Sequence, residues 1–173
     1  MNKVLTPLLL SISLFAYAQP DMPEDEYFNF WIGEWDLTWQ HPDSTIGTGR
    51  NIISRTLNDK VILESFEGLT GQNKGYLGRS WSVYNPQNKE WKQTWVDNQG
   101  AYLDFWAEFS GDKRMFVRKF TGPKGNEVYQ RMVFKDITDD AFTWDWQSST
   151  DGGESWNLQW QINYKRADES TVH

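Results

Sequence analysis

Apolar and polar residues alternate along most of the chain, in short runs separated by turn-forming residues. The clearest run spans residues 156–164, where every second residue is Trp, Leu, Ile or Tyr and every residue between them is an amide. A period of two residues is typical of a strand with one buried face. Tryptophans four residues apart, such as Trp91 and Trp95, would fit one face of a helix, but an even spacing also fits one face of a strand. The alternation around them favours strands.

The pattern predicts ten strands, at residues 34–40, 47–57, 60–67, 74–85, 90–97, 101–110, 113–120, 127–136, 141–149 and 154–165. The breaks between them are short and consist of Asn, Asp, Gly and Pro, so neighbouring strands should be antiparallel. A ten-strand meander has two edges, and closure into a barrel removes both. We therefore expect an all-β, antiparallel up-and-down barrel. The alternative is a two-sheet sandwich, which would usually need longer crossover connections.

The first residues read as a secretory signal peptide. Lys3 supplies a positive charge, residues 4–15 are largely apolar, and Ala16 and Ala18 form a small-x-small cleavage site. The apolar run is shorter than the roughly 20 residues that a membrane-spanning helix needs. We expect cleavage after Ala18 and export to the periplasm or the medium. The alternative is an N-terminal anchor or a helix of the fold.

The rest of the 173-residue chain reads as one domain. Residues 19–26 are acidic and contain proline, which is typical of a flexible lead-in. The barrel domain is expected over residues 27–166, beginning with an aromatic turn at 27–31 that could lie across one end of the barrel. Residues 167–173 form a C-terminal tail.

Composition narrows the chemistry. The chain has no cysteine, which excludes disulfides, thiolate metal sites and a cysteine nucleophile. Eleven Trp, ten Phe and seven Tyr must then supply stability by burial, at about 150–250 Å² each. His41 and His173 are the two histidines, and both lie outside the predicted strands. A Ser-His-Asp triad, a histidine zinc site and a His-ligated haem are therefore not expected, and we expect no cofactor.

The charge excludes two classes of partner. The chain carries 17 Lys and Arg against 24 Asp and Glu, a formal net charge of −7, and loss of Lys3 leaves 16 against 24, or −8. So acidic a protein is repelled by nucleic acid and by anionic membrane surfaces. No second hydrophobic segment predicts membrane insertion of the mature chain.

Residues 149–156 have the pattern Ser-x-Asp-x-Gly-x-Ser-Trp, which resembles the Asp-box hairpin of sialidases and other propeller proteins. Asp151 can accept backbone hydrogen bonds inside such a turn, and Trp156 can pack beneath it. A single copy does not indicate a propeller, because propellers repeat their motifs blade by blade. We expect a structural turn.

Gly33 and Trp35 form a Gly-x-Trp step at the start of the first strand, and Arg166 follows the last one. This arrangement resembles that of lipocalins and calycins. The resemblance implies that Arg166 stacks on Trp35 and closes the barrel through a cation–π contact.

The start of the barrel, the Asp151 turn and residues 82–86 and 91–100 together resemble the exported bacterial family catalogued as domain of unknown function 1579. The resemblance covers residues 28–166. It implies a calycin-like barrel and an exported protein, but the family has no established activity. Nitrobindin-like barrels, a related architecture, hold haem through a histidine inside the barrel, and no residue here matches that ligand.

Strand parity indicates which side chains share the lumen. Trp95 lies on one face with Gln93 and Asp97, and Glu64 alternates with Ile62 and Phe66. Polar groups among aromatic rings are typical of a ligand pocket. The candidate ligand-binding residues are Glu64, Tyr76, Gln93, Trp95, Asp97, Arg131 and Trp144. The alternative is a filled barrel in which the polar groups bond to backbone or water and Arg131 is a solvated outer side chain.

Three functions follow from these features. The first is a barrel that binds a small, partly apolar or amphiphilic molecule in its lumen. The second is a barrel enzyme, a hydrolase or isomerase, with Glu64 or Asp97 as general acid or base. The third is a glycan-binding or interaction module that uses outward tryptophans such as Trp81 and Trp106. The sequence leaves the ligand and the oligomeric state open.

Overall fold

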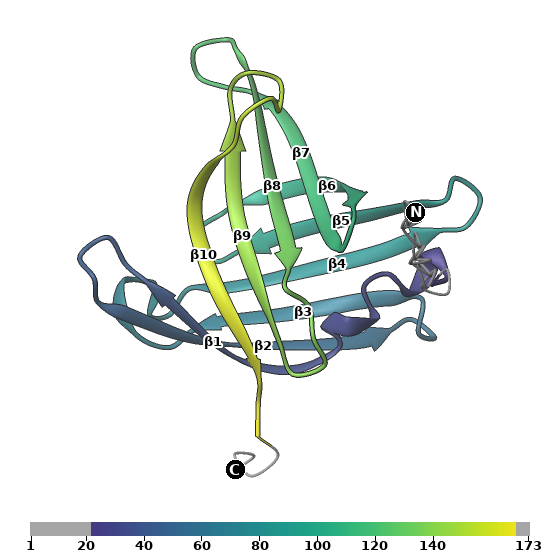
Figure 1. Cartoon of the computed structure of the whole chain (residues 1–173), viewed down its shortest axis with the longest axis horizontal. Helices are drawn as coiled ribbons and strands as arrows, with labels where there is room; N and C mark the ends of the chain where they lie inside the picture. The colour runs from purple at the N-terminus through teal and green to yellow at the C-terminus, as the bar shows by residue number, and fades with distance from the viewer. Residues whose placement is uncertain (1–21, 169–173) are drawn as a thin grey trace, which may run out of the picture.

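A computed structural model describes residues 22–168, in which ten antiparallel strands form one closed barrel (Figure 1). The strands are β1 (Gly33–Gln40), β2 (Ile46–Thr56), β3 (Val61–Gly68), β4 (Leu77–Asn85), β5 (Glu90–Asp97), β6 (Tyr102–Ser110), β7 (Lys113–Thr121), β8 (Glu127–Lys135), β9 (Ala141–Ser149) and β10 (Asn157–Arg166). Each pairs with its neighbours in sequence, and β10 returns to β1. The predicted up-and-down barrel is confirmed, and the sandwich is wrong. The predicted signal peptide, its cleavage after Ala18, and His173 lie outside the described residues.

The barrel is flattened into two walls. Figure 1 shows β2 to β5 running across the view and β7 to β10 running steeply up it, so the strands of the two walls cross. Each wall turns its apolar alternate residues inward; in β1, for example, Trp35, Leu37 and Trp39 are buried and the residues between them are exposed. The helices within residues 22–168 are 3₁₀ turns of three residues, and none is long and apolar enough to cross a membrane.

Two strands begin three residues later than predicted. The 3₁₀ turn η3 (Gly71–Asn73) and Gly75, at a positive φ of 81°, occupy the chain before β4, which starts at Leu77. Before β10, the Asp151 carboxylate accepts hydrogen bonds from the backbone N–H of Ser155 at 3.0 and 3.1 Å. Local turn chemistry therefore delays both strands.

Pairing of β1 with β10 closes the barrel, with Trp35 opposite Arg166. The Arg166 guanidinium carbon lies 4.2 Å from the centre of the Trp35 ring, and its Nη1 donates to the Ile32 carbonyl at 3.2 Å. Gly33 makes this possible: its φ is +134°, and a Cβ there would lie 2.3 Å from Arg166 Nη1. These contacts fasten the seam between the first and last strands.

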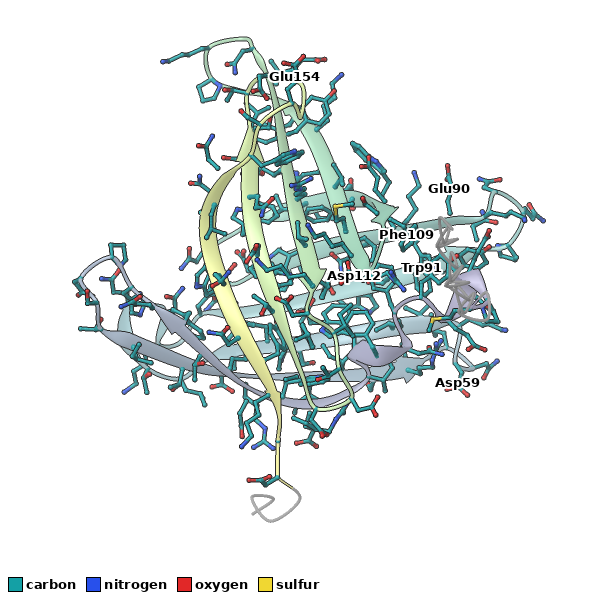
Figure 2. All side chains as sticks on the ribbon, viewed as in Figure 1. Asp59, Glu90, Trp91, Phe109, Asp112 and Glu154 are labelled. Carbon is teal, nitrogen blue, oxygen red and sulfur yellow. The ribbon has the colours of Figure 1, made fainter. Side chains whose placement is uncertain are left out.

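A short aromatic segment, residues 27–31, which we call the plug, closes one end of the barrel. It includes the 3₁₀ turn η2 (Asn29–Trp31) and follows another, η1 (Glu24–Glu26). Phe28 is fully buried and stacks on Phe116 at 4.5 Å. Trp91 and Phe109, labelled close to these turns in Figure 2, also contact Phe28. Glu154, at the tip of the β9–β10 connection, is labelled far from the plug in the same view. The plug therefore seals one end only.

The Asp151 turn is built as the motif predicts. Asp151 Oδ1 accepts from the Ser149 hydroxyl at 2.6 Å, and Gly152 and Gly153 adopt positive φ angles of 78° and 93°. The Trp156 indole N–H donates to the Gly153 carbonyl at 2.9 Å. The hydrogen bond from Ser149 is the main cause of a lowered pKa of Asp151, and the hydrogen bonds from Ser155 lower it further. The turn is a structural device between β9 and β10.

Candidate functional site

The lumen contains a cavity of about 170 Å³. Side chains from β3, β5, β6, β8, β9 and β10 and from the β3–β4 connection line it: Glu64, Phe66, Tyr76, Trp95, Asp97, Leu103, Met132, Trp144, Trp146, Trp160, Ile162 and Tyr164. The cavity shows that the side chains do not completely fill the barrel. The aromatic partners of the Phe28 ring of the plug are Phe30, Trp91, Phe109, Phe116 and Phe134, and none of these five rings lines the cavity.

The lining residues divide into a floor and a rim. The floor is the buried set, Glu64, Phe66, Met132, Ile162 and Tyr164. The rim is the partly exposed set, Tyr76, Trp95, Asp97, Leu103, Trp144, Trp146 and Trp160. Because the rim residues are more exposed than the floor residues, the cavity opens to solvent on the rim side. The β3–β4 and β5–β6 connections lie on this side.

The wall of the cavity is mainly aromatic, and several of its ring pairs meet at steep angles. Trp144 and Trp160 lie 5.8 Å apart with an interplanar angle of 86°. Phe66 meets Trp160 at 81° and Trp95 at 63°, with centroids 6.1 and 6.2 Å apart. Trp146 stacks on Trp144 at 6.3 Å. Edge-to-face pairs of this kind are favourable beyond their buried area and hold ring orientations, so the wall is a fixed aromatic box.

Glu64 is the carboxyl group of the floor, and its residue is 5% exposed. Its Oε1 accepts from Asn51 Nδ2 at 2.7 Å, and its Oε2 accepts from the Ser80 hydroxyl at 2.6 Å. Burial raises the pKa of Glu64 to about 7, although the Ser80 and Asn51 hydrogen bonds oppose the rise. Glu64 can therefore exchange a proton near neutral pH inside the cavity.

The polar network behind Glu64 has acceptor atoms that could form further hydrogen bonds. Asn51 Nδ2 also donates to the Tyr164 hydroxyl at 3.1 Å, while Asn51 Oδ1 is buried with no hydrogen-bond partner among the described residues. Each Glu64 oxygen accepts one side-chain hydrogen bond and could accept another. Because Glu64 and Tyr164 line the cavity, a guest can bond to this floor.

Asp97, on the rim, is occupied by its own turn. Its Oδ1 accepts from the backbone N–H groups of Gln99 and Ala101, and its Oδ2 accepts from the Tyr76 hydroxyl at 2.8 Å and the Trp95 indole at 3.0 Å. Burial alone would raise the pKa of Asp97, but these four donors together lower it. Asp97 positions two aromatic rim residues and stays ionised.

The structure brings five of the seven candidate ligand-binding residues to the cavity: Glu64, Tyr76, Trp95, Asp97 and Trp144. Gln93 does not line it. Gln93 is 3% exposed, and its Nε2 donates to Ser82 at 3.0 Å and Ser80 at 3.3 Å. Parity gave its face correctly, but Gln93 lies beyond the floor, in a filled part of the lumen.

The placement of Arg131 in the lumen is wrong. Arg131 is on the outer face of β8, where its guanidinium lies 3.8 Å from the Trp156 ring centre and its Nε donates to Gln147 at 2.8 Å. The opposite face of β8 carries Met132 and Phe134, which point inward. The sequence was ambiguous because Val133, on the outer face, is also apolar and packs in a small outer cluster with Met115 and Val117.

Seven lining residues were not among the candidates: Phe66, Leu103, Met132, Trp146, Trp160, Ile162 and Tyr164. Apart from Met132, on the ambiguous strand β8, they lie on strands that alternate clearly, so parity could place these six inward. Parity gives no position along the barrel axis, however, and therefore cannot separate a cavity wall from a packed core.

His41 is buried in the β1–β2 connection, where its Nε2 accepts from the Trp39 indole at 3.3 Å. It does not line the cavity. Within residues 22–168, no group of three or more His, Asp or Glu side chains is placed to hold a metal ion.

Two tryptophans lie on the outer wall. Trp81 of β4 is 41% exposed, and Trp106 of β6 is partly buried, with its indole N–H donating to Glu108 at 2.9 Å. They border a shallow groove together with Lys92, Asp104 and Lys119. All eleven tryptophans are within the described residues, and Trp81 is the one that is exposed.

No family model and no curated protein matches the chain. Among solved structures, a de novo designed fluorescence-activating β-barrel aligns with a TM-score of 0.44 and 11% identity, over 83% of this chain and 98% of that one. A redesigned β-barrel aligns with a TM-score of 0.42 and 10% identity, over 83% and 96% of the two chains. Similarity at this level concerns backbone shape and assigns no ligand to this chain.

Proposed function

We propose that this chain is an exported, calycin-like barrel of the family catalogued as domain of unknown function 1579, and that it binds a small, partly apolar molecule in its lumen. One observation carries the binding proposal: an aromatic cavity of about 170 Å³ opens to solvent at its rim and has a carboxyl group on its floor. Apolar pockets with a few convergent polar groups are the usual form of small-molecule sites.

The size of the cavity limits the guest. A cavity of about 150 Å³ lined by apolar side chains holds a benzene-sized molecule. The guest is therefore of one-ring size, with one polar group toward Glu64 and Tyr164.

The test is a titration of the purified protein with small aromatic and amphiphilic compounds, followed by tryptophan fluorescence and by calorimetry. A binding compound should lose at least about tenfold in affinity when Trp144→Leu removes one wall. Trp81→Leu, on the outer wall, is the matched control and should leave affinity unchanged. If no compound binds, or if both variants lose affinity equally, luminal binding is refuted.

A second candidate function is catalysis in the same cavity, favoured by the raised pKa of Glu64. A buried carboxyl that titrates near neutral pH suits a general base. Asp97 is a poorer candidate, because four hydrogen-bond donors occupy its oxygens and its pKa is lowered. Glu64→Gln should then abolish turnover of a bound ester or ketone without loss of folding. Turnover that persists in this variant would contradict the assignment.

A further inference from the structure

Both charged side chains that line the cavity are acidic. Glu64 lies on the floor and Asp97 on the rim, and the described lining includes no Lys, Arg or His. Arg79, next to Ser80 on β4, points away from the lumen, and its guanidinium donates to the Phe66 and Gly78 carbonyl oxygens. The chain as a whole has a formal charge of −7. A guest in the cavity therefore experiences a negative potential, which attracts cations and repels anions.

The aromatic box has the same preference. Four indoles, Trp95, Trp144, Trp146 and Trp160, border one small space together with Phe66 and Tyr76. The face of an aromatic ring carries negative charge density, and tryptophan attracts cations most strongly. Because Trp144 and Trp160 are nearly perpendicular, they form adjacent walls, as in the aromatic cages that bind quaternary ammonium groups.

The floor complements an ammonium group. Glu64 keeps lone pairs free after accepting from Asn51 and Ser80, and no cationic side chain forms an ion pair with it among the described residues. Burial without a counter-ion disfavours its ionised form. An entering cation would supply the missing counter-charge.

We infer that the cavity selects a small organic cation, an amine or quaternary ammonium compound of one-ring size, whose charged end lies among the indoles and faces Glu64. This inference rests on the proposed luminal binding and narrows its ligand from a partly apolar molecule to a cationic one. Asp97, whose oxygens are already engaged, contributes charge at the rim and holds Tyr76 and Trp95 in place.

The experiment compares pairs of probes that have the same shape and differ in charge. The first pair is choline and 3,3-dimethylbutan-1-ol, in which carbon replaces the ammonium nitrogen. The second is 2-phenylethylammonium and 2-phenylethanol. Dissociation constants are measured at pH 8 and low salt by calorimetry and tryptophan fluorescence. In at least one pair the cation should bind at least about tenfold more tightly than its neutral partner.

Glu64→Gln removes the floor charge with little change of shape. It should reduce the preference for the cation to within about threefold, while Glu67→Gln, on the exposed face of the same strand, should preserve it. An equal preference for the cation in the two variants would show that Glu64 does not select for charge and would overturn the inference.

The preference should also depend on pH. The polar and charged groups around Glu64 are Asn51 on β2, Ser80 and the outward Arg79 on β4, Tyr164 on β10, and Tyr76 and Asp97 across the cavity. The pKa of Tyr76 and of Tyr164 is raised and that of Asp97 is lowered, so Glu64 is the group that ionises between pH 5.5 and 8. Choline affinity should rise about tenfold or more over this range, and the affinity of its neutral partner should change little.

The outcomes separate the two proposals. If the neutral partners bind as tightly as the cations, or more tightly, cation selection is overturned and luminal binding stands. If a neutral compound from the wider titration binds and no cation does, cation selection is likewise overturned and luminal binding stands. If neither the four probes nor the wider set binds, both proposals fail.

Discussion

At the scale of single residues, Glu64 is the side chain whose surroundings most alter its chemistry. Its pKa is raised from 4.5 to about 7 by burial, so the folded protein keeps this proton to a higher pH than the unfolded chain does. The stabilisation from this difference is fully present below about pH 4.5 and is lost as the pH rises through 7. The shift corresponds to about 3 kcal/mol.

Glu64→Gln should therefore remove a pH dependence. Between pH 4.5 and 8, the wild-type free energy of unfolding should fall by about 3 kcal/mol relative to that of the variant. Urea unfolding at a series of pH values measures the difference, with Glu67→Gln as the control that keeps the wild-type slope. Parallel curves for wild type and Glu64→Gln would mean that folding does not raise the pKa of Glu64.

In this chain, the alternation of apolar and polar residues predicts the face of a residue more reliably than its position along the barrel axis. Glu64 could be placed inward because Ile62 and Phe66 on either side of it in the alternation are apolar. Parity also predicts the inward face of Gln93, but the position of Gln93 along the barrel depends on how β4 and β5 pair, which the sequence does not state. Arg131 failed because both faces of β8 carry apolar residues, so neither face could be identified as the core.

At the scale of elements, the β4–β5 pair fixes one wall of the cavity. Gly78 of β4 leaves room for the Trp95 ring: a Cβ at Gly78 would lie 2.0 Å from Trp95 Cζ2. An indole buried on one side cannot easily move away, so Gly78→Ala should displace Trp95. We expect a loss of about 1–3 kcal/mol in stability.

The same substitution should weaken luminal binding by about tenfold, because a wall of the site moves. Urea unfolding measures the change in stability, and ligand titration measures the change in affinity. Leu77→Ala, on the outer face of the same strand, is the control and should change neither. An unaltered dissociation constant for Gly78→Ala would show that Trp95 does not shape the site.

The seam between β1 and β10 is the second element-scale feature. Arg166 Nε donates to the Asp139 carbonyl at 2.8 Å, in addition to the Ile32 bond and the stacking on Trp35. A lysine keeps the charge but loses the planar, multiply bonding group. Arg166→Lys should lower stability by about 1–2 kcal/mol.

Hydrogen exchange can locate that loss. The amides of β1 and β10 should exchange faster in Arg166→Lys while those of β4 and β5 stay protected, because the seam opens first. Lys165→Arg, an exposed neighbour, serves as the control. Uniform acceleration over all strands would argue against a local role for Arg166.

Most of these elements could be predicted because alternation, turn residues, short connections and an even number of strands agreed on one topology. Eight of the ten strands begin within one residue of the prediction. The two late strands, at Leu77 and Asn157, follow turns that depend on side-chain hydrogen bonds and positive φ angles, which a hydrophobic pattern does not report.

At the scale of the whole molecule, the barrel divides its tasks between its two ends. The plug packs Phe28 against Phe116, Phe134 and Trp91, and none of these rings lines the cavity. Phe142 lies between the two regions: it contacts Phe134 at 5.9 Å and stacks on Tyr164 of the floor at 4.2 Å. The plug end therefore supplies stability, and the rim end supplies the site.

Phe28→Ala tests this division. Phe28 is fully buried, so its truncation should cost about 3–5 kcal/mol in unfolding free energy. Ligand affinity, measured where the variant is still folded, should change by less than about twofold, because separated sites act independently. Leu103→Ala at the rim should do the reverse, weakening binding with a smaller loss of stability. A large loss of affinity in Phe28→Ala would instead mean that the packing of the plug affects the floor of the cavity through Phe142, and that the two ends of the barrel are energetically coupled.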